Sequence, residues 1–269
     1  MSDFYKPHRK AEWNYGGPNW KLSRSKIDLF LECPRCFYVD NKLGVARPPG
    51  FPFALNSAVD KLLKKEFDTH RAKKTAHPLM KKYGIDAVPL QHVKIEEWRD
   101  SLRAGVSTRH APTGFLVRGG VDDVWVKPDG ELIVVDYKAT AKDGEVSLDA
   151  EWQDGYKRQM EVYQWLFRQN GFRVSDTGYF VYVNGKTDRE AFDAKLEFDV
   201  KIIPYIGKTD WVEPTLVEIK KCLESETEPA SAERCDYCNY RRAADEVSAR
   251  KVLSEKTVEN TAHEKATLF

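Results

Sequence analysis

Little net charge, few cysteines and no long apolar run characterise this 269-residue sequence, and each shortage excludes a class of protein. With 43 basic against 42 acidic residues the formal net charge is +1, so no global positive field attracts nucleic acid and any such binding needs local patches. No apolar stretch is long enough to span a bilayer, and the N-terminal stretch MSDFYKPHRKAEWNYGG lacks the apolar core of a signal peptide. We therefore expect a cytoplasmic protein without membrane association.

The sequence contains several local clusters of basic residues, but no helicase motif and no internal repeat. The candidate patches are Lys6 to Lys10, Arg71 with Lys73, Lys74, Lys81 and Lys82, and Arg99 with Arg103 and Arg109. Each group is more often a solvated face than a binding surface. A nucleic-acid enzyme built on this chain would need a helicase or repair protein as partner to act processively.

Two Cys-x-x-Cys pairs, Cys33 with Cys36 and Cys235 with Cys238, lie about two hundred residues apart. In a reducing compartment such pairs favour metal binding over disulfides. Each pair can chelate from a single turn, so together they predict a four-thiolate zinc or iron–sulfur site that joins the N- and C-terminal segments. The fifth cysteine, Cys222, falls on an apolar helix stripe and is expected to be a buried small hydrophobe.

Hydrophobic periodicity predicts a mixture of helices and strands. Helical spacing covers residues 25–32, 57–74, 95–103, 149–170 and 210–226, and the alternation typical of strands covers 115–126, 131–139, 177–185 and 190–200. We expect an N-terminal arm over 1–22, one domain over 23–246, and a polar, poorly ordered tail over 247–269.

Two acidic residues interrupt the apolar strands that flank the turn KPDG. Pro128 to Gly130 suits a three-residue hairpin loop, which would place Asp122 directly across from Asp136. A two-residue turn would instead place Asp123 there. Lys138 shares the face of Asp136 because strand side chains alternate.

Opposed carboxylates repel each other, and a divalent cation between them would turn that repulsion into binding. Oxygen ligands suit Mg²⁺ or Mn²⁺, which can activate water and stabilise charge on a phosphoryl group. Lys138 would hold the attacking water or neutralise the developing charge. The alternative is a solvated strand end.

The stretch RGGVDDVWVKPDGELIVVDYKAT resembles the core motif of PD-(D/E)xK nucleases, particularly the RecB-like branch, over residues 23–241. The resemblance implies an α/β fold of the restriction-endonuclease type, with a mixed central sheet flanked by helices. It implies a Mg²⁺- or Mn²⁺-dependent deoxyribonuclease, exonuclease-like in DNA repair, recombination or defence, that acts on single-stranded DNA or duplex ends.

Three further site residues follow from this resemblance. Gln159 and Tyr163 match a Gln and Tyr one helical turn apart, so Gln159 is expected near the metal or scissile phosphate with Tyr163 supporting it; without the resemblance, they suit a core face. Asp60 stands where the branch has a His ligand, and Asn56 where it has Gly. The metal ligands implied are therefore Asp60, Asp122 and Asp136.

RecB-like nucleases of the AddB type and CRISPR-associated exonucleases carry a [4Fe–4S] cluster on one N-terminal and three C-terminal cysteines. This chain has two and two, with Cys36 in the place of the missing ligand, so the resemblance implies [4Fe–4S] with zinc as the alternative. Two other functions stay open. One is a catalytically silent nucleic-acid-binding or assembly module, and the other is a zinc-stapled interaction protein without a nucleic-acid role.

Overall fold

The computed structural model describes residues 9–50 and 54–266, and the side chains of residues 9–50 and 55–251. The chain forms two compact units. Unit 1 takes in residues 1–19, 29–49 and 222–269, and unit 2 takes in residues 20–28 and 50–221. Unit 1 is thus assembled from three separate pieces of the sequence. No helix within the described residues is long and apolar enough to cross a membrane.

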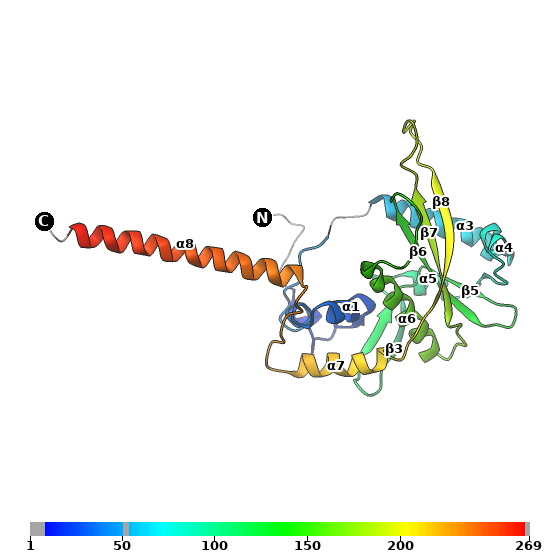
Figure 1. Ribbon diagram of the computed structural model, residues 1–269. Helices are drawn as coiled ribbons and strands as arrows, with labels where there is room; N and C mark the ends of the chain where they lie inside the picture. The colour runs from blue at the N-terminus through cyan, green and yellow to red at the C-terminus, as the bar shows by residue number, and fades with distance from the viewer. Residues whose placement is uncertain (1–8, 51–53, 267–269) are drawn as a thin grey trace. The chain divides into compact units, whose positions relative to one another are not determined.

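Unit 2 contains two mixed sheets, as the sequence predicts for an α/β fold. The larger has the strand order β2-β5-β6-β7-β8 and the smaller the order β1-β4-β3. Among the strands of the described residues, β6 with β7 and β1 with β4 run parallel, and the other pairs run antiparallel. The bounds of the strands are β1 Leu22–Ser23, β2 Val88–Pro89, β3 Val106–Arg109, β4 Leu116–Gly119, β5 Asp123–Val126, β6 Leu132–Thr140, β7 Thr177–Gly185 and β8 Phe198–Ile206 (Figure 1).

The central strand β6 is buried on both faces because a helix packs against each one. Its odd-numbered residues Ile133, Val135 and Tyr137 join a core with Leu63 and Phe67 of α3 Ala54–Lys73. Its even-numbered residues face α6 Asp154–Gln169, where the Lys138 ammonium meets Gln159. The helices α4 Pro78–Lys82 and α5 Ile95–Arg99 complete the central part of unit 2, and α1 Arg24–Glu32 and α7 Val212–Glu224 contribute residues to both units.

The predicted hairpin register is confirmed. Lys127 accepts a hydrogen bond from Gly130 and donates one to Glu131 through the backbone, and Gly130 has φ +83°, as a three-residue loop requires. The paired residues run from Val126 with Leu132 to Asp123 with Val135. Continuing the register by one residue sets Asp122 across from Asp136, which excludes the two-residue turn.

The single strand predicted over 115–126 is wrong, because the chain bends at Gly119 and Gly120. A Cβ on Gly120 would lie 2.4 Å from the Cβ of Ser101, and one on Gly119 would lie 2.5 Å from the ring of Tyr163. These close approaches place β4 and β5 in different sheets. Asp122 therefore sits at the bend, just before β5.

Three smaller predictions also fail. The strand predicted over 190–200 begins at Phe198 and runs to Ile206, and the helix predicted over 95–103 ends at Arg99. The helical spacing of residues 57–74 predicts one apolar stripe that includes Leu62, Leu63 and Phe67, but Leu62 is exposed while the other two are buried. Each failure lies at the end of an element or the edge of an apolar stripe, where hydrophobic periodicity is least informative.

Unit 1 contains η1 Ala11–Trp13, α2 Pro34–Asn41 and α8 Asp236–Ala266. The N-terminal stretch contacts α2 within this unit, since Tyr15 donates a backbone hydrogen bond to Asn41 and Arg9 pairs with Asp40 at 2.6 Å. The backbone of α8 is helical through most of the segment for which the sequence predicts a polar tail. The division at residues 22 and 246 stays a prediction.

Candidate functional site

The acidic pair predicted from the sequence lies where β5 and β6 meet. Asp136 has no exposed surface, whereas the side chain of Asp122 is 24% exposed. The backbone amide of Tyr137 donates a hydrogen bond to Oδ2 of Asp122 at 2.9 Å, which turns this carboxylate toward the end of β6. The bend at Gly120 thus places one buried and one accessible carboxylate side by side.

Asp136 is a buried carboxylate whose oxygens are not satisfied. The Lys138 ammonium lies 2.5 Å from Oδ2, but neither oxygen has a partner in hydrogen-bond geometry. Burial, against the opposing charge of Lys138, raises the pKa of Asp136 to about 7, and the nearby charge of Asp122 raises it further. A buried carboxylate that is paired with an ammonium but has no partner in hydrogen-bond geometry can accept a further cation.

Asp60 of α3 joins this pair through a lysine that the sequence analysis missed. Nζ of Lys64 lies 2.9 Å from Asp60 and 3.3 Å from Asp122, so one ammonium bridges both carboxylates. Burial lowers the pKa of Lys64, but the charge of Asp122 and the hydrogen bond to Asp60 outweigh it, and the pKa is raised overall. The i,i+4 spacing of Asp60 and Lys64 was the available signal.

The side chains of Lys138, Gln159 and Tyr163 form a chain of contacts, in the order that the resemblance implies. Oε1 of Gln159 accepts from Lys138 at 3.1 Å, and its Nε2 donates to the Tyr163 hydroxyl at 3.2 Å. The Lys138 ammonium also lies 4.2 Å from the ring centre of Tyr156. Burial raises the pKa of Tyr163 to about 12, so this hydroxyl keeps its proton.

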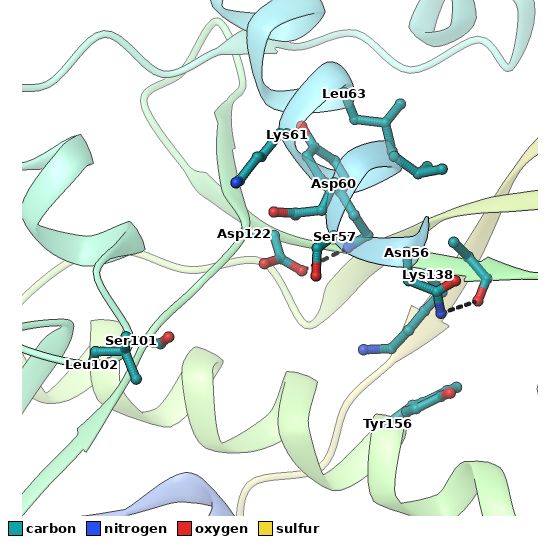
Figure 2. Close-up of a pocket in the computed structure, with 13 residues that line it drawn as sticks. Asn56, Ser57, Asp60, Lys61, Leu63, Ser101, Leu102, Asp122, Lys138 and Tyr156 are labelled. Carbon is teal, nitrogen blue, oxygen red and sulfur yellow. Dashed lines mark hydrogen bonds between the residues drawn. The ribbon is translucent and has the colours of Figure 1, made fainter. Parts of the chain in front are cut away.

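A cavity of about 620 Å³ is lined by Asp60, Asp122, Lys138 and Tyr156, among others (Figure 2). In Figure 2 the carboxylates of Asp60 and Asp122 point toward each other, and Lys138 and Tyr156 lie together nearby. Asn56, which replaces the usual Gly, donates a hydrogen bond to the carbonyl of Ala139 at 3.1 Å and ties α3 to β6. The carboxylates of Asp60, Asp122 and Asp136 are the hard oxygen donors that a divalent cation prefers, so the residues fit such an ion.

A buried charge network supports the site from the other face of the hairpin. Asp123 is fully buried; it pairs with Arg71, lies 3.2 Å from Arg99 and accepts from the Tyr137 hydroxyl at 2.8 Å. Arg99 also donates to the carbonyl of Asp122 at 3.1 Å, which fixes the backbone of the accessible carboxylate.

Arg71 and Arg99 are therefore wrong as candidates for exposed basic patches, because both guanidinium groups are committed to buried partners. The patch at Lys6 to Lys10 lies partly outside the described residues. The signal for the network was the second Asp of the pair Asp122-Asp123 within an apolar strand. The two arginines could not be assigned to it from sequence.

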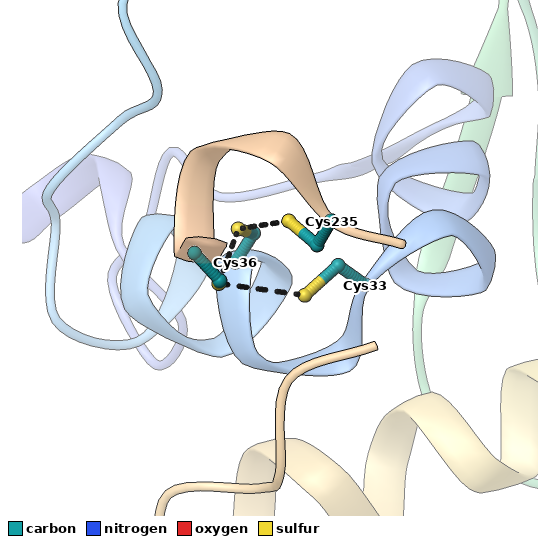
Figure 3. Close-up of side chains that lie close together, drawn as sticks. Cys33, Cys36 and Cys235 are labelled. Atoms are coloured by element: carbon teal, nitrogen blue, oxygen red, sulfur yellow. Dashed lines mark hydrogen bonds between the residues drawn. The ribbon is translucent and has the colours of Figure 1, made fainter. Parts of the chain in front are cut away.

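The four paired cysteines of unit 1 converge, and this confirms the prediction that they join the N- and C-terminal segments. Their sulfur atoms all lie within 4.8 Å of one another (Figure 3). Burial raises the pKa of Cys36 and Cys238, whereas in Cys33 it is outweighed by backbone hydrogen bonds from Cys36 and Ala232, which lower the pKa to about 7. Cys222 is half-buried, and burial raises its pKa too.

Comparisons with known proteins address the whole chain. The family model described as "PD-(D/E)XK nuclease superfamily" matches residues 21–243. The solved structure titled "Crystal structure of SSO0001" is 15% identical with a TM-score of 0.39, and the match covers 78% of this chain and 79% of that one. At that TM-score we draw nothing from the likeness. No curated protein matches this sequence.

Proposed function

The chain belongs to the PD-(D/E)XK nuclease superfamily, and on that premise we propose that it is a Mg²⁺- or Mn²⁺-dependent deoxyribonuclease of the RecB-like type that hydrolyses phosphodiester bonds. One observation carries the proposal: the buried and unsatisfied carboxylate of Asp136 lies beside the accessible Asp122 and the ammonium of Lys138. The proposal further includes an exonuclease-like action in DNA repair, recombination or defence, and a cytoplasmic location.

The proposed ligands of the divalent cation are Asp122 and Asp136, with Asp60 as a third. A cation held there would acidify a bound water and stabilise negative charge on the phosphoryl group. Without a bound cation Asp136 is partly protonated at neutral pH, because burial disfavours its ionised form and raises its pKa to about 7. Its affinity for a cation therefore depends on losing a proton, and Asp122 supplies a permanently accessible second oxygen.

Lys138 is the residue that we propose to act on the reacting phosphate. Gln159 and Tyr156 hold its ammonium at the cavity, where it can orient the attacking water or neutralise charge on the phosphoryl oxygens. Tyr163 positions Gln159 through its hydroxyl. Lys61, exposed on the rim of the same cavity, adds positive charge facing a polyanionic substrate.

The test compares the purified protein with a variant that lacks the buried carboxylate. We expect end-labelled single- and double-stranded DNA to be degraded with Mg²⁺ or Mn²⁺, and Asp136→Ala to lose that activity while keeping its circular dichroism spectrum. Asp86→Ala, at an exposed acidic position, serves as the matched control. Equal activity of Asp136→Ala and the parent would refute the mechanism. RNA substrates in the same assay define the preferred nucleic acid.

A second function, the catalytically silent nucleic-acid-binding module, is favoured by Lys64. Its ammonium pairs with both Asp60 and Asp122, so the charge of these two carboxylates is balanced without a metal ion. Calorimetric titration with Mn²⁺ separates the two functions. Heat of binding that disappears in Asp136→Ala supports the nuclease, whereas no binding together with intact, salt-dependent DNA binding supports the silent module.

A further inference from the structure

The four sulfur atoms of Cys33, Cys36, Cys235 and Cys238 are close enough to share a single ion. Cys36 lies 3.5 Å from Cys235 and 3.5 Å from Cys238, and Cys33 lies 3.9 Å from Cys238. A zinc–sulfur bond of about 2.3 Å places tetrahedral thiolates roughly 3.8 Å apart. The observed separations are therefore those of four ligands around one tetrahedral centre.

A four-iron cluster makes a different demand on its thiolates. Each cysteine binds a different iron of the cube, so the four sulfur atoms must stand apart by the width of the cluster and leave its volume free between them. Here all four cysteine sulfurs lie within 4.8 Å of one another, which leaves no room for a cluster between them (Figure 3). The cysteines as arranged do not fit the [4Fe–4S] cluster that the family resemblance implies.

The local structure around each pair repeats the same arrangement. Cys33 is the N-cap of α2 and Cys36 lies in its first turn, while Cys235 directly precedes α8 and Cys238 lies in its first turn. Free amide groups at helix N-termini stabilise negative charge, and Nη2 of Arg47 adds a donor 3.5 Å from Cys235. Two helix starts thus present two thiolates each to one point.

We propose that these cysteines bind one zinc ion in a closed, structural site. All four coordination positions are filled by protein sulfur, and Cys33, Cys235 and Cys238 are buried, so no open position is left for water or substrate. The ion holds α2 to the start of α8 within unit 1. It takes no part in electron transfer, because zinc has no redox chemistry.

Elemental analysis of the full-length chain, purified without added metal and under anaerobic conditions, tests this directly. We expect one zinc per chain and no acid-labile sulfide. Iron and labile sulfide in equal amounts, with a visible absorption that dithionite bleaches, would overturn the proposal. Asp136→Ala should retain its zinc, which keeps this result separate from the outcome of the nuclease assay.

Cobalt replacement gives a second readout that does not depend on activity. Exchange of the bound ion for Co²⁺ should produce the intense visible bands of a tetrahedral thiolate complex, saturating at one equivalent. Cys33→Ser should weaken these bands, and Cys222→Ser, which changes the cysteine outside the group, should leave them unchanged. Absence of these thiolate bands, or thiolate bands that saturate only at several equivalents, would contradict a single closed site; Co²⁺ bound at the carboxylates gives weak octahedral bands and does not interfere.

Discussion

The carboxylate cluster of unit 2 and the cysteine cluster of unit 1 differ in what each leaves accessible. Asp60 and Asp122 border a cavity of about 620 Å³ and are bridged by Lys64, an ammonium that can move away. The sulfur atoms of the cysteines instead lie within 4.8 Å of one another, and Cys33, Cys235 and Cys238 are buried. An open cluster suits exchange of ions and substrate, whereas a closed one suits the joining of chain segments.

Metal removal should give the largest difference between the two clusters, measured as protease sensitivity and as activity. Structural zinc contributes roughly 10–16 kcal/mol of apparent binding free energy in four-ligand modules, so stripping it should expose segments 29–49 and 222–251 to protease. Mild EDTA treatment, which removes ions from carboxylates, should abolish activity without that exposure. Limited proteolysis with mass spectrometry measures both. Identical cleavage patterns after the two treatments would contradict the assignment of a structural role to the cysteines.

Asp123→Asn should destabilise unit 2 without adding or removing a proposed metal ligand. Arg71 and Arg99 would lose their buried counter-charge and keep only their pairs with partly exposed carboxylates such as Asp68, a loss of about 3 kcal/mol in the free energy of unfolding. Urea denaturation of the full chain measures this loss. The control Asp86→Asn should change it by less than about 0.5 kcal/mol. A variant as stable as the control would show that the network does not support the site.

Lys138→Met should damage the chemistry while leaving the binding of Mn²⁺ in place. Loss of a group that stabilises transition-state charge lowers kcat by about 10²–10³-fold. Steady-state cleavage assays and calorimetry on the same sample check the two quantities. Lys65→Met, which removes an exposed ammonium of α3 that does not line the cavity, should retain its activity. Loss of Mn²⁺ binding in Lys138→Met would instead make this lysine a support for the carboxylates.

At the carboxylate cluster, the pH dependence of stability and of Mn²⁺ affinity should come from Asp136. Burial raises its pKa to about 7 from an ordinary value near 4, so the folded chain binds a proton that the unfolded chain releases. Its contribution to stability is therefore full at low pH, and falls between about pH 4 and 7 by up to about 1.4 kcal/mol per unit.

Binding of a cation requires the ionised carboxylate, so Mn²⁺ affinity should rise about tenfold per pH unit up to about pH 7 and then level off. Calorimetry across this range measures the slope. Asp86→Asn should keep the slope and Asp136→Asn should lose it. A slope that persists without Asp136 would assign the proton to another group.

Lys64→Met should have the smallest effect and the opposite sign. Removing the ammonium that neutralises Asp60 and Asp122 should tighten Mn²⁺ binding by up to about fivefold, since a partly exposed pair contributes up to about 1 kcal/mol. Lys65→Met, at the next and exposed position of α3, is the matched control. Weaker binding in Lys64→Met would show that the lysine organises the two carboxylates.

The sequence predicts the hairpin well because its register depends on local chemistry. Pro128 and Gly130 select the loop, the loop sets the pairing, and the pairing places Asp122 across from Asp136. Lys138 then follows from strand alternation. The expectation that Gln159 lies near the metal or scissile phosphate came only from the family resemblance, since the helical spacing alone favours a core face.

The parts that the sequence did not predict depend on distant contacts. Asp123 pairs with Arg71 across 52 residues, and no local period encodes that contact. The residues on either side of Gly119 and Gly120 alternate like one strand, so the sequence does not show the bend. The close approaches of Ser101 and Tyr163 to these glycines are contacts that local periodicity does not encode. The spacing of cysteines along the sequence does not determine the distances between their sulfur atoms. The two Cys-x-x-Cys pairs therefore did not decide between a zinc ion and an iron–sulfur cluster.

The insertion of unit 2 between the pieces of unit 1 sets an order for biosynthesis. Cys33 and Cys238 are 205 positions apart, and all residues of unit 2 from 50 to 221 are translated between them. A nascent chain can therefore complete unit 2 on the ribosome while Cys33 and Cys36 still wait for their partners. Closure of the cysteine site can therefore follow the folding of unit 2, because its last ligand, Cys238, is synthesised after residue 221.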